Sequence, residues 1–263
     1  MRLCVAVLLL LFAGLGTAQV PPPGGARDRA AYPESDAVAA WRALAASYVR
    51  KALKDRKLDK DPVLNARVDA VMSAVGAAVA AIDPRYAGAS WKAILIEDFG
   101  RGAAAFPGGM ILVDTRFVRN LALTDDELAL LLSHEAAHVV AGHASAKLSF
   151  MAEFLGKGKV PTARTALIEF LAKDSYAEAF RPEALLQERE ADTVGAAILF
   201  ASGYDTQRAL RLFDKVAQLE TLERARGESA AESHDSAVLR KQSVAAVINE
   251  LQQLLARPAA GPR

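Results

Sequence analysis

Apolar residues recur at helical spacing over four long stretches of the chain. The first stretch runs from Ser35 to about Leu58, and Asp61-Pro62 then opens a second helix that continues to Ile82. Two more helices are expected from Thr206 to Arg224 and from Ala237 to Leu255. In the first stretch, the apolar positions that share one helix face are Val38, Trp41, Leu44, Tyr48 and Leu53.

Two short runs with β-strand character interrupt this helical pattern. Trp91 to Ile96 and Met110 to Val113 are rich in large apolar and β-branched residues. Glycines and a proline at 102 and 107–109 separate them, which is typical of turns. The pattern therefore predicts two strands of a small sheet in a mostly helical α+β fold.

Capping signals mark the helices in the second half of the chain. Thr124, followed three residues later by Glu127, forms a capping box, and the helix that it opens runs from Leu128 to about Gly142. The segment from Ser145 to Phe180 is a less regular helical insert that is broken by glycine and proline. A further helix is expected to start at Pro182 and to end at Gly203.

The capped helix contains an H-E-x-x-H motif, His134-Glu135-Ala136-Ala137-His138. Because His134 and His138 are four residues apart, their imidazoles project from one face, about 6 Å apart along the helix axis. Two such side chains can hold one zinc ion at about 2.0–2.1 Å each. Glu135 lies about 100° around the helix, beside the ion, where its carboxylate can take a proton from an activated water molecule.

A second pair of residues at helical spacing, Glu188 and Asp192, occurs later in the chain. A catalytic zinc site needs a third protein ligand and one open position, and we assign Glu188 as that ligand. Asp192 is expected to accept a hydrogen bond from the free ring nitrogen of His134 or His138. Glu190 points roughly 200° away from Glu188 around the helix and is expected to be a solvated or structural carboxylate.

His143 distinguishes this arrangement from a metzincin. A metzincin places its third histidine six residues after the second, past a glycine turn. His143 is five residues after His138, and Ala141 stands where that glycine would be. On a continuing helix the side chain would point roughly 140° away from His138. We therefore expect His143 to satisfy carbonyls at the helix end or to pack in the core.

Composition sets only broad limits on function. A hydrophobic content of 52% and a charged content of 24% are ordinary for a soluble globular protein. The net charge of +1 argues against nucleic acid or an anionic membrane surface as the main partner. Cys4, the only cysteine, precedes the amino-terminal apolar run, and a mature chain without that segment must hold any metal with His, Asp or Glu.

The amino terminus has the pattern of a secretory signal peptide. A basic start is followed by an apolar run from Val5 to Ala13 and by small residues up to Ala18, after which cleavage is expected. The expected organisation is a signal peptide over 1–18, a flexible lead-in over 19–34, one zinc metallopeptidase domain over 35–256 and a disordered tail over 257–263. The mature protein is expected to be periplasmic or secreted, with a retained N-terminal anchor as the alternative.

Further motifs occur in the same order as in a known family. Phe106 to Val113 looks like its P-G-G-x-I-x-V strand, and Thr124 to Leu128 leads into the H-E-x-x-H helix in the same way. Glu188 to Asp192, Gly203-Tyr204-Asp205, and Ser233-His234-Asp235 with Arg240 look like its E-x-x-A-D, G-Y-D and H-P-x-x-x-x-R elements. Over most of Asp61 to Leu255 the chain thus resembles the HtpX/BepA-like zinc metallopeptidases, gluzincins whose relatives include the CAAX prenyl endopeptidases.

This resemblance implies a zincin-like α+β domain with a small sheet, an active-site helix and one Zn²⁺ per chain. It implies an edge strand that pairs with an extended substrate, although a buried structural strand is the alternative. That strand consists of Met110, Ile111, Leu112 and Val113. The resemblance also places His234 and Arg240 near the zinc, where they would stabilise the oxyanion. Alternatively, His234 would occupy the open metal position in a self-inhibited state. An ordinary surface charge is the alternative for Arg240.

Together these features predict a zinc-dependent endopeptidase of the cell envelope that acts on extended or misfolded protein substrates. The alternative is a latent, self-inhibited zinc protein that acts mainly as a chaperone or assembly factor. It is motivated by His234 and by the apolar insert from Ser149 to Ala172, which could form a lid, a membrane-surface face or core. Protein segments are the expected partners, without nucleic acid or integral membrane anchoring, and the oligomeric state is left open.

Overall fold

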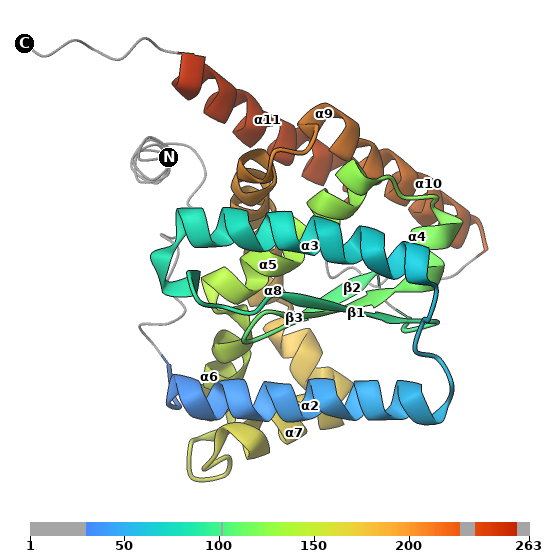
Figure 1. The fold of residues 1–263 in the computed structure, drawn as a ribbon. Coiled ribbons are helices and arrows are strands. Elements are labelled where there is room, and N and C mark those ends of the chain that lie inside the picture. Colours follow the sequence, from blue (N-terminus) through green and yellow to red (C-terminus); the bar gives the residue numbers. More distant parts are fainter. Residues whose placement is uncertain (1–29, 101, 227–234, 257–263) are drawn as a thin grey trace, which may run out of the picture.

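The computed structural model describes residues 30–100, 102–226 and 235–256, which form a mostly helical structure around a three-stranded sheet (Figure 1). The helices are α2 (Glu34–Lys54), α3 (Pro62–Ile82), α4 (Thr115–Asn120), α5 (Asp125–Ala141), α6 (His143–Leu155), α7 (Ala163–Ala172), α8 (Asp174–Ser202), α9 (Thr206–Ala209), α10 (Arg211–Ala225) and α11 (Ala237–Ala256). The strands are β1 (Lys92–Ile96), β2 (Ala103–Phe106) and β3 (Met110–Asp114), and a short 3-10 turn, η1, spans Pro84–Tyr86. The predicted signal peptide, most of the lead-in and the predicted tail lie outside the described residues.

The sheet has the order β1-β3-β2. β3 pairs in parallel with β1 and antiparallel with β2, with Leu112 opposite Ile94 on one side and Ala104 on the other. Sequence analysis missed β2 because a run of three alanines and a phenylalanine lacks the β-branched residues that mark strands. The third strand changes the assignment of the edges, since β3 becomes the central strand.

The central position of β3 shows that the predicted substrate-binding strand is wrong. Ile111 and Val113 face a core built with α3 and α5, whereas Leu112 faces a second core built with α2, α6 and α7. Alternating side chains of a strand point to opposite faces, so a strand between two cores is apolar throughout. Met110 to Val113 therefore form a buried structural strand with both backbone edges paired.

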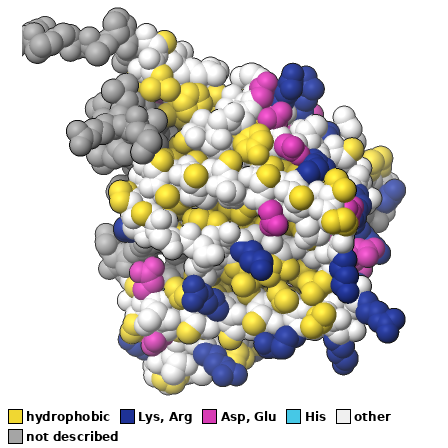
Figure 2. Space-filling model, viewed as in Figure 1, with side chains coloured by type: hydrophobic (Ala, Val, Ile, Leu, Met, Phe, Trp, Pro, Cys, Tyr) yellow, Lys and Arg dark blue, Asp and Glu magenta, His cyan; other side chains and the backbone are white. Residues whose placement is uncertain are grey.

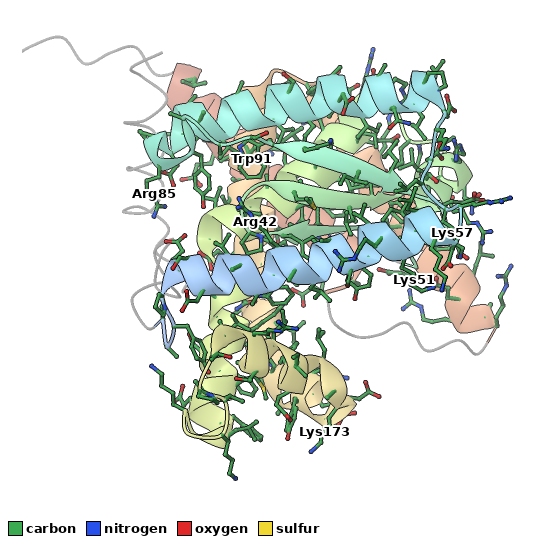
Figure 3. The ribbon with its side chains drawn as sticks, turned by 60° about the horizontal axis from the view of Figure 1, so that its bottom comes forward. Arg42, Lys51, Lys57, Arg85, Trp91 and Lys173 are labelled. Atoms are coloured by element: carbon green, nitrogen blue, oxygen red, sulfur yellow. The ribbon has the colours of Figure 1, made fainter. Side chains whose placement is uncertain are left out.

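A tight three-residue turn, Pro107-Gly108-Gly109, joins β2 to β3. Gly108 and Gly109 have φ angles of +90° and +87°, a region that residues with a side chain rarely adopt. A Cβ at Gly108 would collide with the guanidinium of Arg42, and one at Gly109 would lie 2.9 Å from the carbonyl oxygen of Ser90. Figure 3 shows Arg42 of α2 and Trp91 on either side of this end of the sheet. The turn thus fixes β2 beside β3.

The ends of α5 follow from local sequence. The capping box is confirmed, because the Thr124 hydroxyl accepts from the Glu127 N–H while the Glu127 carboxylate accepts from the Thr124 N–H. At the other end Gly142 adopts a left-handed conformation with φ +77°. The chain changes direction there, and α6 begins at the next residue, His143.

The helix that carries Glu188 begins earlier than predicted. α8 starts at Asp174 and contains Pro182 in its interior, so proline does not open this helix. Proline removes one intrahelical hydrogen bond, which weakens a helix but does not end it where packing holds both sides. Such packing exists before Pro182: the ring of Phe180 lies 5.1 Å from that of Phe150 and 5.7 Å from that of Phe170.

The insert predicted between Ser149 and Ala172 packs largely as core. Met151 and Leu167 are fully or almost fully buried against α2, while Phe154, Ile168 and Leu171 are about half exposed. The end of the predicted flexible lead-in is also ordered. Tyr32 is buried in the same core, and its hydroxyl donates to the carbonyl of Val160. Ala31 and Tyr32, which the prediction placed in the lead-in, thus contact the folded domain.

Among the described helices, α3 alone is long and apolar enough to cross a membrane, with a mean hydropathy of 1.4. Of the residues in that window, 44% are buried inside the structure, and core helices pass the same test. The finding is thus weak evidence for a membrane span.

Figure 2 shows Lys and Arg side chains over the lower part of one face, around α2, and no histidine is visible on that face.

Candidate metal centre

The two histidines of the H-E-x-x-H motif and Glu188 converge on one point between α5 and α8. The Nε2 atoms of His134 and His138 are 3.1 Å apart. The Glu188 carboxylate lies 3.2 Å from Nε2 of His134 and 3.5 Å from Nε2 of His138. These side chains form the one group of potential metal ligands found in the described part of the chain.

The spacing of these three atoms fits a metal ion. Ligand atoms that each lie about 2.0–2.1 Å from a tetrahedral ion are about 3.3 Å apart, close to the three separations above. Two imidazoles and one carboxylate are also a known donor set for catalytic zinc, with a fourth position left open. In both His134 and His138, Nε2 faces this point and Nδ1 contacts another side chain.

Asp192 and Arg240 hold the far side of His134. Nδ1 of His134 is 3.0 Å from Oδ1 of Asp192, where sequence analysis placed that carboxylate. Arg240 of α11 donates to both oxygens of Asp192, from Nε at 2.9 Å and from Nη2 at 2.8 Å. The imidazole donates its Nδ1 proton to Asp192, which leaves Nε2 as the ligand atom.

Arg240 lies beside the candidate metal centre, as the family resemblance implies. Its side chain is mostly buried, with a relative exposure of 18%, so it is not an ordinary surface charge. Its guanidinium approaches the Nδ1 side of His134, opposite the ligand atom, and is committed to Asp192. Arg240 thus holds His134 in place through Asp192, and its predicted oxyanion-stabilising role stays a prediction.

His138 has a different support, which sequence analysis missed. Its Nδ1 atom lies 2.8 Å from Nδ1 of His143, and Nε2 of His143 lies 3.2 Å from Oε2 of Glu190. Neither residue is solvated: His143 is 2% exposed and Glu190 is 8% exposed. The expectation for His143 assumed a continuing helix, whereas Gly142 redirects the chain and turns this ring toward His138.

The left-handed glycine was the available signal. A glycine directly after an apolar helical run is typical of a helix end, and the next residue then lies off the helix face. The sequence contains that glycine at position 142. For Glu190 no local signal existed, because its partner lies on a separate helix.

Glu135 is buried beside the ligands and reaches the sheet. Its carboxylate accepts a hydrogen bond from the backbone N–H of Ala105 in β2. Burial raises the pKa of Glu135, the charge of His134 opposes this, and the charge of Glu188 adds to it. A carboxyl group with a raised pKa both accepts and returns a proton more readily near neutral pH.

Considering protein groups alone, the two ligand histidines differ in protonation. Burial opposes the charged form of His134, but hydrogen bonds to Asp192 and Glu188 outweigh it and raise its pKa to about 9. Burial lowers the pKa of His138 to about 4, although the hydrogen bond to Glu188 acts in the opposite direction. The site thus concentrates negative charge that one cation can balance.

The outer edge of β2 is open beside Glu135. The N–H of Asp114 bonds to the carbonyl of Gly102, and backbone groups of alternate residues in an antiparallel pair point the same way. Gly102, Ala104 and Phe106 therefore face β3. Ala103 and Ala105 direct their backbone groups away from β3, toward the side on which Glu135 lies. The open edge next to Glu135 therefore belongs to β2, a strand that the sequence pattern did not predict.

His234 lies outside the described residues, so its predicted catalytic and metal-blocking roles stay predictions. The described chain resumes at Asp235, whose carboxylate pairs with Arg189 of α8 at 2.7 Å. This pair keeps the start of α11 close to the helix that provides Glu188 and Asp192.

The fold and the donor set together define a metal-dependent protease, and comparison with known proteins agrees. Residues 62–248 match the model of peptidase family M48, and the chain belongs to this family of metalloproteases. It is similar to the mitochondrial metalloendopeptidase OMA1 of Arabidopsis thaliana, with 26% identity over 137 residues. That similarity covers 50% of this chain and 27% of the relative, so the chain spans about a quarter of that protein's length.

Proposed function

We propose that the chain is a zinc-dependent endopeptidase that hydrolyses extended protein segments. The observation that carries the proposal is the convergence of Nε2 of His134, Nε2 of His138 and the Glu188 carboxylate, with separations of 3.1–3.5 Å. His134, His138 and Glu188 would hold one zinc ion. The mitochondrial metalloendopeptidase similar to this chain supports endopeptidase activity over exopeptidase activity.

The zinc ion would supply Lewis acidity that activates water and polarises the scissile carbonyl. Glu135 takes the proton of the attacking water and then delivers it to the departing amine. Its hydrogen bond with the Ala105 N–H holds the carboxylate at the edge of β2, near enough to His134 and Glu188 for their charges to affect its pKa. Asp192 and Arg240 keep His134 in the tautomer that leaves Nε2 free to bind the ion.

Pairing with the edge of β2 would present the substrate to this site. Ala103 offers an N–H and a carbonyl, and Ala105 offers a carbonyl, on the open side of the strand. Such backbone pairing is tolerant of substrate sequence and requires an extended chain. It therefore favours unfolded or misfolded proteins over folded ones as substrates.

An exported location is part of the same proposal. It rests on the basic start, the apolar run and the small residues up to Ala18. Amino-terminal sequencing of the protein recovered from cells tests it. A mature end at Gln19 supports export with cleavage, whereas an intact amino terminus on protein that stays in the cytoplasm contradicts export.

Cleavage of unfolded casein by the purified chain tests the peptidase proposal. The zinc-loaded protein, its Glu135→Gln variant and a control, Glu153→Gln, are compared at equal metal content. Glu153 is an exposed acid on α6, so its variant controls for loss of one carboxylate. We expect the parent and control to cleave casein and the Glu135→Gln variant to retain zinc without cleaving. Zinc bound by the parent chain without cleavage would reject the proposal and favour the latent, chaperone-like alternative.

A further inference from the structure

Each ligand histidine has its own buried carboxylate, but the two are connected differently. His134 contacts Asp192 directly, with 3.0 Å between Nδ1 and Oδ1. His138 reaches Glu190 through a second imidazole, that of His143, with steps of 2.8 Å and 3.2 Å. All these acidic groups lie on α8, the helix that also provides the Glu188 ligand.

The positions of protons along this chain of contacts follow from the ligand geometry. Nε2 of His138 faces the other two ligand atoms, so the proton of a neutral ring sits on Nδ1. That N–H can donate only if Nδ1 of His143 accepts, 2.8 Å away. His143 must then carry its own proton on Nε2, which donates to Glu190. Every nitrogen is satisfied in one arrangement only.

Burial makes this arrangement necessary. His143 and Glu190 are 2% and 8% exposed, so bulk water cannot readily replace either partner. The rings of His138 and His143 lie at 74° to each other with centroids 4.9 Å apart, which fixes the second ring against the first. A ligand histidine whose distal nitrogen has a fixed acceptor is held in one tautomer and one orientation.

We propose that His143 and Glu190 are positioning residues for the metal centre: they hold His138 with Nε2 free, through a relay from imidazole to imidazole to carboxylate. The proposal rests on the proposed function, because it takes His138 as a metal ligand. It assigns His143 a role other than ligand, helix cap or core packing. Glu190 acts on His138 through His143, whereas Asp192 acts on His134 directly. Neither residue touches substrate.

Zinc affinity of a set of variants, measured by competition with a chromophoric chelator, tests the relay. His143→Leu fills the same space without hydrogen-bonding atoms, whereas His143→Gln offers one acceptor and one donor. We expect His143→Leu to lower zinc affinity by about 10- to 100-fold and His143→Gln to recover most of it. A packing role alone gives the opposite order, because an amide is less tolerated in a dry core than a leucine.

A double-variant comparison separates a relay from two independent effects. If His143 and Glu190 act through one path, the affinity of the pair His143→Leu with Glu190→Leu is no lower than that of the worse single variant. Independent roles would multiply the losses. Leu148→Val, a conservative change at a fully buried position on the same helix, controls for loosening of α6 and should leave zinc affinity unchanged.

The absorption bands of the Co²⁺-substituted protein give a readout of ligand geometry that is independent of activity. We expect the bands to shift in His143→Leu and to stay at the parent position in His143→Gln. Equal spectra and equal affinities for the parent, Leu and Gln forms would overturn the relay while leaving the proposed function intact. Failure of the parent chain to bind either metal would instead reject the proposed function. If His143→Leu does not fold, Glu190→Gln, which keeps an acceptor but loses the charge, must still weaken zinc binding.

Discussion

Replacing Arg240 with methionine should destabilise the fold by about 2–3 kcal/mol. The change removes two charged hydrogen bonds to Asp192 but keeps apolar volume beside the ring of Phe213, which lies 5.4 Å from the guanidinium. Asp192 is only 6% exposed, so the variant leaves a buried carboxylate with His134 as its remaining partner. Arg240 should therefore contribute more than a surface charge would.

Two lines of reasoning give this magnitude. Breaking one side of a buried ion pair costs about 3–5 kcal/mol, and the 18% exposure of the Arg240 side chain places this pair at or below the lower end. Burial tends to raise the pKa of Asp192, yet Arg240 and His134 lower it from 3.8 to about 2. At neutral pH that net shift corresponds to about 2.4 kcal/mol of stability, to which Arg240 and His134 both contribute.

Urea unfolding in the presence of a chelator measures the effect without a contribution from bound metal. Arg240→Met, Asp192→Asn and the double variant form a cycle. Because the double variant no longer contains an unpaired buried charge, it should lose at least about 1.5 kcal/mol less than the sum of the single losses. A loss below about 0.5 kcal/mol for Arg240→Met, or strictly additive losses, would refute this account of Arg240.

Three further outcomes are expected. Zinc at about 100 times its dissociation constant should stabilise the parent chain by about 2.7 kcal/mol, and Glu188→Gln should strongly reduce this stabilisation. Equal zinc-dependent shifts in melting temperature for the parent and the variant would argue against Glu188 as a ligand. Ala103→Pro removes one N–H from the open edge of β2 and should lower kcat/KM for casein about fivefold while zinc affinity stays unchanged. An unchanged kcat/KM would argue against substrate pairing at this edge. Burial raises the pKa of Asp59, but Arg119 and the Asp61 N–H outweigh burial and lower it overall, so Asp59 should stabilise the fold above its ordinary pKa of 3.8 and lose this contribution as pH falls through the lower folded value. Asp59→Asn should therefore lower the free energy of unfolding at pH 7 but not below the folded pKa. An equal loss at both pH values would contradict the assignment.

Short-range sequence features predicted much of this structure. The capping box at Thr124 and the 3.6-residue spacing of His134 and His138 depend on residues within one or two turns of helix. For the same reason, Glu188 and Asp192 could be placed on one helix face before their partners were known. The order of motifs then indicated the family, which the match over residues 62–248 shows.

Features that depend on long-range pairing could not be predicted in the same way. Three alanines give little strand propensity, so β2 becomes a strand only through its pairing with β3. That pairing also moves β3 from the edge to the centre of the sheet. Pro182 stays within a helix because aromatic residues far apart in the sequence pack on the preceding turns.

The support of the ligand histidines shows the same division. Motif spacing predicted that Asp192 contacts His134 or His138, and the structure shows that the partner is His134. The relay from His138 through His143 to Glu190 depends on a single left-handed glycine, Gly142, and on how α6 meets α8. Local patterns thus pointed to the candidate ligands, whereas the groups that orient them required the packed structure.

Anomalous X-ray diffraction at the zinc absorption edge, from crystals of the zinc-loaded chain, tests the central claim most directly. We expect one peak per chain, about 2.0–2.1 Å from Nε2 of His134, Nε2 of His138 and a carboxylate oxygen of Glu188, with a fourth position open to solvent. A zinc peak held by other residues, or no peak at these three atoms under saturating zinc, would contradict the metal centre and the peptidase mechanism built on it.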